Sequence, residues 1–319
     1  MLNKNPIYGK VSIVLPVYNG GEYLQAAVES IINQTLKQWH LIIINDGSTD
    51  GSTNYLNSLS DDRITVLHQE NQGLSYSLNR GLDLCDTEFV ARMDCDDFAY
   101  SERLEKQLAF MEANPEVGLL GTQIKRVGMQ RTDSGSSLPT THEDIIDVLM
   151  NGGHAICHPT IFCRKAVFDE IGGYKAGLGE EWDIFLRIGE QWKLANLNDC
   201  LLNYRYHGTS INGSRMMELR RRIRFACECA RRRTEGLAEI PYEDFLASEK
   251  QDSFFRRLQR SSEDYSRASY HAAMADILGD NRMRGYARLG VAAVSAPQLV
   301  FHRIHRRLTR PKRTDAAKK

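Results

Sequence analysis

The sequence predicts a doubly wound α/β protein with a mostly parallel sheet, followed by a helical C-terminal extension. Three short apolar runs rich in β-branched residues, at residues 11–18, 40–46 and 63–70, are typical of parallel strands that are covered on both faces. A stretch with the helical spacing of apolar residues separates the first two runs. Polar residues follow each predicted strand, at the edge where sheets of this class bind their ligands.

The first elements are predicted in the order β-α-β-turn-β-α-β. Between the first two strands, Leu24, Val28 and Ile31 fall on one helical face. Residues 74–85 predict a second helix, which leads into a strand at residues 88–94. This alternation is the pattern that produces a doubly wound sheet.

The alternation continues less regularly after residue 100. We expect a helix that Ser101 caps and that stops near Pro115. The further elements expected are a strand at 117–127, a polar loop at 131–141, a helix at 142–150, a strand at 158–164, a helix after the glycines of 177–191, and a strand or hairpin at 193–208.

Helical patterns without strand signals begin near residue 214. A boundary is therefore placed between Ser210 and Arg215. It predicts one domain at residues 1–212, which contains the sheet, and a helical region at residues 213–319, which ends in a basic tail.

Composition excludes few functions. Lys+Arg and Asp+Glu both total 41 in the 319 residues, so net charge does not indicate a polyanionic partner. Seven scattered cysteines predict reduced thiols and a cytoplasmic protein. The N-terminus lacks the pattern of a signal peptide, and no run of about eighteen apolar residues predicts a membrane-spanning helix.

Asp94, Asp96 and Asp97 stand together where the fourth strand ends. Carboxylates are hard oxygen donors, and Mg²⁺ or Mn²⁺ takes one or two of them and fills its remaining positions with substrate phosphates and water. A solvated turn or a helix N-cap is the alternative for an isolated Asp-x-Asp, but the other polar strand ends favour a ligand site. Walker and dinucleotide fingerprints are absent, so side chains and a metal ion must meet the charge of a bound nucleotide.

Several segments in this order resemble the inverting glycosyltransferase family 2, which has the GT-A fold of nucleotide-diphospho-sugar transferases. They are VSIVLPVYNGGEYL, IIINDGSTDGS, NQGLSYSLNRG and ARMDCDDFAYSERLEKQ, followed by HPTIFCRKAVFDEIGGY and GEEWDIFLRI, and they cover about residues 8–210. The resemblance implies an enzyme of bacterial surface-polysaccharide assembly. Such an enzyme would use Mg²⁺ or Mn²⁺, take a sugar from a UDP-sugar, and form a β-glycoside on a glycan or lipid-linked glycan acceptor.

The resemblance also assigns nucleotide-binding roles by position. Pro16, Tyr18 and Asn19 would border the nucleotide base, with Glu22 nearby. Asp46 resembles the aspartate that accepts a hydrogen bond from the uracil ring in this family. The alternatives are that Tyr18 packs in the protein and that Asp46 caps the turn that follows it.

Metal and phosphate roles follow in the same way. Asp94 would face the ribose and the metal, Asp96 would bind the metal, and His207 stands where some relatives place a further metal ligand. The family's third motif often ends Ala-Arg-Asn, whereas here it reads Ser-Leu-Asn at residues 77–79. Arg80 or Arg92 would then be left to contact the diphosphate.

An inverting transferase needs a base that takes the proton of the acceptor hydroxyl. GEEWDIFLRI resembles the family's E-D-x-D segment, with Glu181 where the aspartate base usually stands and Glu180 as the neighbouring candidate. Trp182 would stack on a sugar or pack in the core, Asp183 would orient the acceptor or a neighbouring loop, and His158 would line the acceptor side. The alternative for the two glutamates is a helix N-terminus that simply favours negative charge.

The C-terminal stretch at residues 290–313 joins apolar residues to a dense run of Arg and Lys. Such an element can lie on an anionic membrane surface, which would place the enzyme peripherally on the cytosolic face of the inner membrane. The alternative is a packing helix followed by a solvated tail. Nucleic acid is not expected as a partner, because no aromatic residues interleave with the charges.

Two rival functions remain at this stage. A sugar-nucleotide pyrophosphorylase would need a glycine-rich, basic signature after the first strand, and YNGGEYLQ lacks one. A catalytically silent scaffold that binds nucleotide sugars would be favoured if Glu181 proved dispensable.

Overall fold

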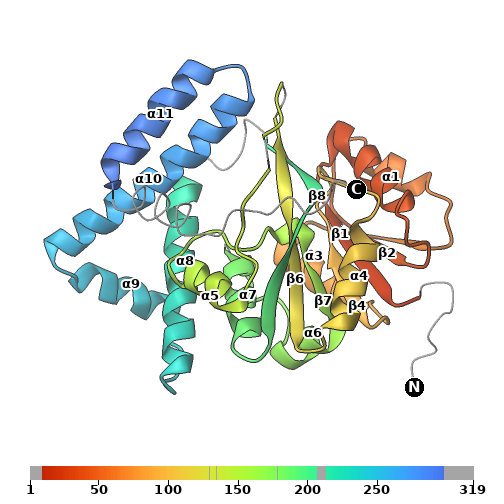
Figure 1. The fold of residues 1–319 in the computed structure, drawn as a ribbon, viewed down its shortest axis with the longest axis horizontal. Coiled ribbons are helices and arrows are strands. Elements are labelled where there is room, and N and C mark those ends of the chain that lie inside the picture. The colour runs from red at the N-terminus through yellow and green to blue at the C-terminus, as the bar shows by residue number, and fades with distance from the viewer. Residues whose placement is uncertain (1–8, 129, 134, 178, 207–212, 298–319) are drawn as a thin grey trace, which may run out of the picture. The chain divides into compact units, whose positions relative to one another are not determined.

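The protein is described here from a computed structural model, in which residues 9–297 are described apart from 129, 134, 178 and 207–212. The strands are β1 (Val11–Val17), β2 (His40–Asp46), β3 (Ile64–Gln69), β4 (Phe89–Arg92), β5 (Phe98–Ala99), β6 (Val117–Val127), β7 (Phe162–Arg164) and β8 (Lys193–Arg205). They form one 8-stranded sheet in the order β3-β2-β1-β4-β7-β6-β8-β5 (Figure 1).

The helices of the described residues come in two groups along the chain. Those that alternate with the strands are η1 (Gly21–Tyr23), α1 (Leu24–Ile32), α2 (Ser52–Asn57), α3 (Leu74–Asp83), α4 (Arg103–Ala113), α5 (His142–Met150), η2 (His158–Thr160), α6 (Lys165–Ile171) and α7 (Glu180–Gly189). Those that follow the last strand are α8 (Gly213–Thr234), α9 (Tyr242–Gln251), α10 (Phe254–Leu278) and α11 (Arg282–Ser295).

Most of the predicted elements are confirmed, and three details were wrong. A short helix, α2, replaces the turn predicted between the second and third strands. Ser101 does not cap α4, whose N-cap position is Glu102 without a side-chain hydrogen bond. The strand predicted at 158–164 is shorter, because Pro159 lies in the one-turn helix η2 before β7 begins. The last segment, predicted as a strand or a hairpin, is one long strand, β8.

The first half of the sheet places the polar strand ends together. Strands β3, β2, β1 and β4 are mutually parallel, and β1 pairs with β2 on one side and with β4 on the other. The chain therefore reverses its direction of progress across the sheet at β1, which is the position where open α/β sheets bind ligands. Strand β7 is antiparallel to both β4 and β6, whereas β6 and β8 are parallel to each other, so β7 interrupts a mostly parallel sheet.

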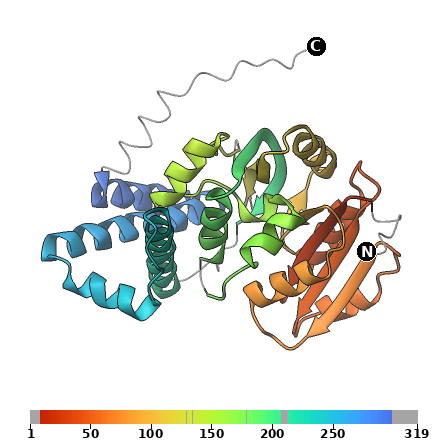
Figure 2. The ribbon, with the colours of Figure 1, turned by 90° about the horizontal axis from the view of Figure 1, so that it is seen from below.

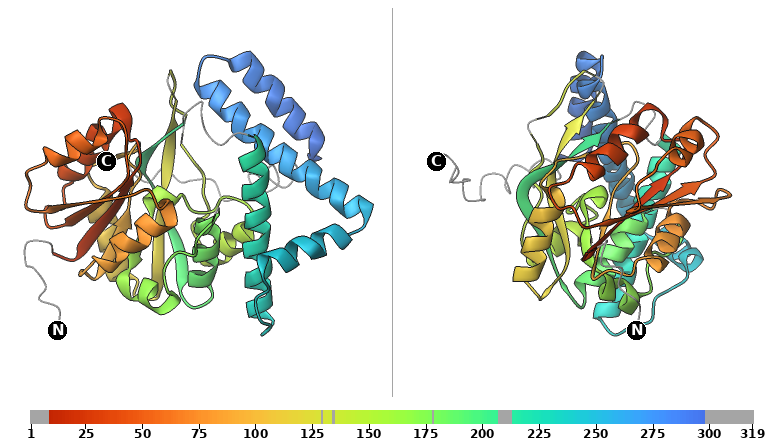
Figure 3. Two further views of the ribbon diagram at one scale, coloured as in Figure 1. Left: turned by 180° about the vertical axis from the view of Figure 1, so that it is seen from behind. Right: turned by 90° about the vertical axis from the view of Figure 1, so that its right-hand side faces the viewer.

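Helices cover both faces of the sheet (Figure 3). Ile42 and Ile44 of β2 belong to a core with residues of α3, α5, α6, α7 and α8. Leu41 and Ile43, on the opposite face, belong to a core with residues of α1, α2 and α4. Since successive strand residues point to opposite faces, burial on both sides explains why these strands are continuously apolar.

Helix α3 approaches β1 so closely that Gly81 has no room for a side chain. A Cβ atom at Gly81 would overlap Cγ1 of Val14. We expect Gly81→Ala to lower the free energy of unfolding by about 1–3 kcal/mol, because overpacking outweighs the better helix propensity of alanine. Denaturant unfolding measures this, with Gly51→Ala as the control, since a Cβ at Gly51 meets nothing within 4 Å. Equal stability of both variants would contradict the close approach.

The chain forms two compact units, which differ from the division predicted at residue 212. Glu218–Ile240, including most of α8, groups with the sheet-containing unit that extends to Tyr206. Ile223 and Ala226 of α8 are part of that unit's core, which is why this segment packs there. In the other unit α10 and α11 lie side by side (Figures 1 and 2), and Ser266 donates to the backbone oxygen of Ala292 at 2.6 Å.

Two predicted features lie outside the described residues, namely His207 and the basic tail, whose residues fall within the undescribed range 298–319. Within the part of the chain that is described, no helix combines the length and the apolar composition that crossing a bilayer requires.

Candidate active site

The loops that follow β1 and β2 are hydrogen-bonded to each other. The N–H of Asn19 donates to Ser48 Oγ at 3.0 Å, and the N–H of Thr49 donates to Asn19 Oδ1 at 2.8 Å. Asn19 adopts φ 53°, a left-handed conformation that asparagine tolerates better than most residues. The N–H of Gly20 donates to Ser52 Oγ at 3.0 Å. These contacts join the two strand ends in one preorganised rim.

Asp46, the last residue of β2, is 4% exposed and holds the segment that enters α3. Its carboxylate accepts hydrogen bonds from Gln69 Nε2 at 2.7 Å and from the N–H groups of Gln72 at 2.8 Å and Gly73 at 2.9 Å. Only the last of these reaches Oδ2, so that oxygen keeps a lone pair for a further donor. Asp46 therefore does more than cap its own turn.

The other residues predicted to bind the nucleotide differ in exposure. Pro16 is buried within β1, and Glu22 is exposed. Tyr18 is 55% exposed, so the structure does not support the alternative in which its ring packs in the core. An aromatic face beside the rim of Asn19 is suited to stacking on a planar base.

Asp94, Asp96 and Asp97 come together beyond the end of β4. One carboxylate oxygen from each lies within 4.8 Å of the others. Asp97 is 2% exposed; its Oδ1 accepts from the N–H of Arg205 at 2.8 Å, whereas its Oδ2 is buried and has no hydrogen-bond partner among the described residues. Burial raises the pKa of Asp97 well above its usual range, and the two neighbouring carboxylates raise it further.

This acidic cluster fits a hard divalent cation. Its donors are all carboxylate oxygens, which Mg²⁺ and Mn²⁺ prefer. The buried, unpartnered Oδ2 of Asp97 is a costly atom in a native structure unless something binds it. A cation would also relieve the mutual repulsion of the three carboxylates.

Arginines surround the acidic cluster. Arg92, 4% exposed, donates to Asp94 Oδ2 at 2.7 Å, and Arg103 donates to the backbone oxygen of Arg92 at 2.7 Å. Burial disfavours the charge on Arg92, but Asp94 outweighs this and raises the pKa of Arg92. Burial also raises the pKa of Asp94, which remains raised although Arg92 acts in the opposite direction.

Arg205 also lies at the acidic cluster, although no pattern in the sequence predicted it there. Its Nε donates to the backbone oxygen of Asp96 at 2.9 Å, and its guanidinium lies 4.0 Å from the centre of the Tyr23 ring. It stands at the end of the long strand β8, far along the chain from the acidic cluster. No local motif marks it, so only the pairing of β8 with β5 brings it to the site.

Arg80 lies in the Asp46 network rather than beside the acidic cluster. It donates to Gln69 Oε1 at 2.6 Å, and Gln69 in turn donates to Asp46. Of the two arginines considered for the diphosphate, Arg92 is therefore the one in contact with an aspartate of the cluster.

Glu181 lies in the first turn of α7, which begins after Gly179 in a left-handed conformation of φ 78°. Its side chain is 22% exposed. Burial, followed by repulsion from Glu180, raises the pKa of Glu181 to about 8, and Arg92 and Asp94 are close enough to affect it as well. Burial likewise raises the pKa of Glu180. The candidate base and the acidic cluster thus share one electrostatic environment.

His158 and Asp183 both lie near Glu181. His158 is 5% exposed, and its Nδ1 lies 3.8 Å from Glu181 Oε2. Asp183 accepts from Arg187 Nε at 2.8 Å, and Arg187 donates to the backbone oxygen of Gly173, so Asp183 is connected to a neighbouring loop through Arg187.

Trp182 is placed in the core. It is 4% exposed, its Nε1 donates to the backbone oxygen of Gly153 at 3.1 Å, and its ring packs edge-on against His154 at 4.9 Å. A buried ring with its polar atom satisfied cannot stack on a sugar without moving. The sugar-stacking interpretation of Trp182 is therefore not supported.

The chain is similar to known bacterial glycosyltransferases. Residues 12–172, just over half of its 319 residues, match the family model described as Glycosyl transferase family 2. The putative glycosyltransferase EpsE of Bacillus subtilis is 32% identical over 213 residues, which cover 64% of this chain and 74% of that protein. The chain therefore belongs to glycosyltransferase family 2, and it is an enzyme of the glycosyltransferase class.

Further relatives have names that refer to polysaccharide biosynthesis. The O-antigen biosynthesis glycosyltransferase WbnJ of Escherichia coli is 31% identical over 65% of this chain and 84% of that protein. The amylovoran biosynthesis glycosyltransferase AmsE of Erwinia amylovora is 31% identical over 64% of this chain and 79% of that protein.

Solved structures support the fold. Residues 1–349 of S. aureus TarS, crystallised in complex with UDP-GlcNAc, match with a TM-score of 0.58 and 14% identity over 92% of both chains. The same region in complex with UDP matches with a TM-score of 0.53 and 16% identity. Together with the family match, this confirms the predicted GT-A fold with its helical C-terminal part.

Proposed function

We propose that this glycosyltransferase moves a sugar from a UDP-sugar to a hydroxyl of a glycan or lipid-linked glycan, with inversion at the anomeric carbon. The observation that carries the proposal is the shared environment of Glu181, Arg92 and the acidic cluster of Asp94, Asp96 and Asp97. A leaving diphosphate and an attacking hydroxyl need these two kinds of group side by side.

The nucleotide would occupy the rim formed by the loops after β1 and β2. The exposed ring of Tyr18 offers a stacking surface, and Oδ2 of Asp46 offers an acceptor for the uracil N–H. Pro16, Asn19 and Glu22 would border the base. The choice of uridine is supported by the crystallised complexes of TarS, which contain UDP-GlcNAc and UDP.

The acidic cluster would hold Mg²⁺ or Mn²⁺, with Asp96 as a ligand and Asp94 facing the ribose and the metal. When bound, the cation supplies positive charge that stabilises the departing diphosphate. Arg92 adds a fixed positive charge at the same place, since Asp94 raises its pKa. His207 remains a proposal for a further metal ligand.

Glu181 would act as the base. The acceptor oxygen forms a bond to the anomeric carbon, the bond from that carbon to the UDP oxygen breaks, and the hydroxyl proton passes to the Glu181 carboxylate. A carboxyl group with a pKa of about 8 is a strong proton acceptor once ionised, and the charge of Arg92 favours that ionised form. Inversion from an α-linked donor gives a β-glycoside.

The relatives named for O-antigen and amylovoran biosynthesis support a place in bacterial polysaccharide assembly. A lipid-linked acceptor would be reached at the cytosolic face of the inner membrane. Peripheral contact through the basic tail stays part of the proposal.

Calorimetric titration with UDP, with and without Mn²⁺, tests the donor and metal assignments. We expect UDP to bind only with Mn²⁺, and Asp96→Ala to raise the Kd at least about a hundredfold, since it would remove a charged ligand of the cation. Asp83→Ala is the control, because it removes an exposed carboxylate at the end of α3, where the chain leads into the start of β4 and not beyond its carboxyl end.

Each other outcome has a meaning. If the parent protein ignores UDP in both conditions, the UDP-sugar assignment is wrong. If UDP binds but no UDP-sugar is turned over, and Glu181→Gln changes nothing, the silent scaffold becomes the better interpretation.

A further inference from the structure

Three side chains form a series that ends at the proposed base. The hydroxyl of Tyr174 lies 2.9 Å from Nε2 of His158, and Nδ1 of His158 lies 3.8 Å from Oε2 of Glu181. Tyr174 and His158 are each 5% exposed, so water does not compete for these contacts. Tyr174 is thus linked to Glu181 through the imidazole.

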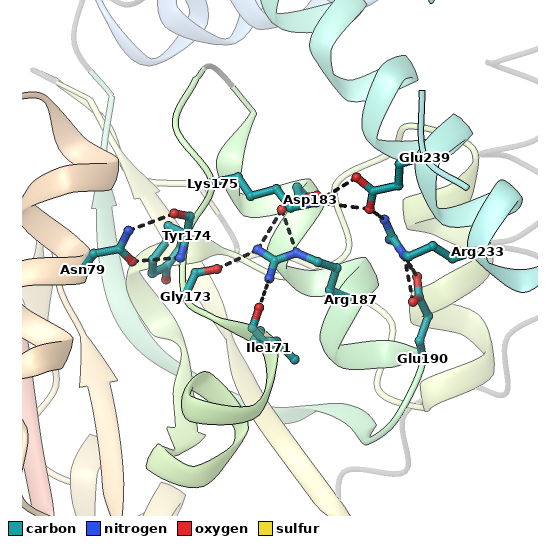
Figure 4. Close-up of polar contacts among 10 residues, drawn as sticks. All are labelled: Asn79, Ile171, Gly173, Tyr174, Lys175, Asp183, Arg187, Glu190, Arg233 and Glu239. Carbon is teal, nitrogen blue, oxygen red and sulfur yellow. Dashed lines mark hydrogen bonds and ion pairs between the residues drawn. The ribbon is translucent and has the colours of Figure 1, made fainter. Parts of the chain in front are cut away.

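The backbone of Tyr174 is held on both sides by one asparagine. Asn79 Nδ2 donates to the Tyr174 carbonyl at 2.8 Å, and the Tyr174 N–H donates to Asn79 Oδ1 at 2.8 Å (Figure 4). Gly173 permits this approach, because a Cβ atom there would lie 2.6 Å from Asn79 Oδ1. Asn79 ends the segment in which the family's arginine is missing, and the clamp gives this residue a role of its own.

A buried arginine holds the residues before Tyr174. Arg187, 8% exposed, donates to the carbonyls of Ile171 at 2.7 Å and Gly173 at 2.6 Å (Figure 4). Asp183 pairs with the same guanidinium and neutralises it. The segment that carries Tyr174 is therefore fixed by charged hydrogen bonds from α7, the helix that also carries Glu181.

Ion pairs continue this network outward to α8. Lys175 donates to Glu239 at 3.0 Å, Arg233 pairs with Glu239, and Arg233 also pairs with Glu190 at 2.7 Å (Figure 4). These side chains are more exposed than Arg187, so each of their ion pairs contributes less to the stability of the fold. They still brace the Tyr174 segment against the end of α7.

The protonation states of Tyr174 and His158 determine which of them donates the hydrogen bond and which nitrogen of the imidazole carries the proton. Burial, with a smaller effect of Arg92, lowers the pKa of His158 well below its usual range, and burial raises the pKa of Tyr174. Both groups are therefore neutral at pH 7, and the imidazole carries one N–H. A hydroxyl that donates to Nε2 leaves that proton on Nδ1, facing the Glu181 carboxylate. When Glu181 is ionised, as a base must be, the opposite tautomer would direct a lone pair at its negative charge.

We propose that Tyr174 is a positioning residue for the base: its hydroxyl donates to His158 Nε2 and so holds the imidazole as the Nδ1–H tautomer that faces Glu181. Asn79 and the Asp183–Arg187 pair keep Tyr174 in the required place. The inference rests on the proposed role of Glu181 as the base. No proton moves along the series, because Glu181 itself keeps the proton taken from the acceptor.

Histidine NMR tests the tautomer without any substrate. In protein labelled with ¹⁵N-histidine, the His158 signals are assigned by their loss in His158→Gln. Above pH ~8, where Glu181 is ionised, we expect the parent to show protonated Nδ1 and unprotonated Nε2, and Tyr174→Phe to lose this fixed tautomer. Tyr100→Phe is the matched control, because it removes a hydroxyl that donates to Asn203 Oδ1 at the same distance of 2.9 Å.

Two NMR results would overturn the proposal. One is protonated Nε2 in the parent, which would make Tyr174 the acceptor. The other is an unchanged Nδ1–H tautomer in folded Tyr174→Phe. Thermal denaturation of each variant shows that it is folded before its spectrum is interpreted.

The pH dependence of turnover provides the second readout, measured as UDP release from UDP-glucose, UDP-galactose and UDP-N-acetylglucosamine. Without a fixed Nδ1–H, the ionised Glu181 carboxylate no longer faces the positive end of an N–H dipole at 3.8 Å and its pKa rises, so we expect kcat at pH 7 to fall about tenfold in Tyr174→Phe. The acid limb should move to higher pH with KM for the donor unchanged, which a purely structural role would not produce. The other groups that face this series are Glu180, Arg92, Asp94, His154 and Cys163.

Failure of the inference and failure of the proposed function give different results. If Glu181→Gln remains active, the assignment of the base is wrong whatever Tyr174 does. If Glu181→Gln is inactive while Tyr174→Phe keeps the parent tautomer and the parent pH profile, only the role of Tyr174 is wrong.

Discussion

Glu181→Gln is expected to lower the rate of sugar transfer by about 10²–10⁴-fold, the usual contribution of a positioned general base. The amide keeps the shape of the side chain but cannot take the acceptor proton. Binding of UDP with Mn²⁺ should remain close to that of the parent, because the acidic cluster is intact. The loss should therefore fall on kcat rather than on KM for the donor.

The same substitution is expected to stabilise the protein at alkaline pH. The folded state raises the pKa of Glu181 from 4.5 to about 8, so between these values it binds more protons than the unfolded state, and stability falls as the pH rises. Glu181→Gln removes this dependence. Its advantage should be about 1–3 kcal/mol above pH ~8 and should vanish below pH ~4.5.

Denaturant unfolding across this pH range and turnover of the UDP-sugar panel check the two effects. Glu180→Gln is the matched control, since it removes the neighbouring carboxylate of the same helix turn. It should lower the pKa of Glu181, because Glu180 is among the groups that raise it. If Glu180→Gln loses more turnover than Glu181→Gln, Glu180 is the base and the assignment to Glu181 is wrong.

Arg92→Met is expected to lower the free energy of unfolding by about 3 kcal/mol, the lower end of the range for breaking a buried ion pair. Asp94 would keep its negative charge beside Asp96 and Asp97 without the guanidinium that now donates to it. The lower end applies because the side chain of Asp94 is 28% exposed, and water can partly replace Arg92.

A double-mutant cycle separates the ion pair from lost packing. Arg92→Met with Asp94→Asn should recover part of the stability, since the remaining partner is then neutral. Additive losses would show that Arg92 acts mainly by filling space. Addition of Mn²⁺ should stabilise Arg92→Met more than the parent, because the cation replaces the missing positive charge.

Local patterns in the sequence were sufficient for the parallel half of the sheet. Strands β1 and β2 are buried on both faces, and continuous β-branched runs report that environment directly. The acidic cluster was also readable, because its three aspartates are close in sequence and follow one strand. For Trp182 the sequence was equally compatible with stacking on a sugar and with packing in the core. The structure decided between them, because the side chain is buried in the core.

What the sequence determined by itself is the class of fold, the family and the position of the carboxylates, since these depend on short segments with their own periodicity and order. Only the tertiary structure brought Arg205 to Asp97 and joined Tyr174 and His158 to Glu181. These contacts connect segments far apart in the chain, through strand pairing and helix packing that no local pattern encodes. The raised pKa of Glu181 has the same origin, because burial and neighbouring charges exist only in the folded protein.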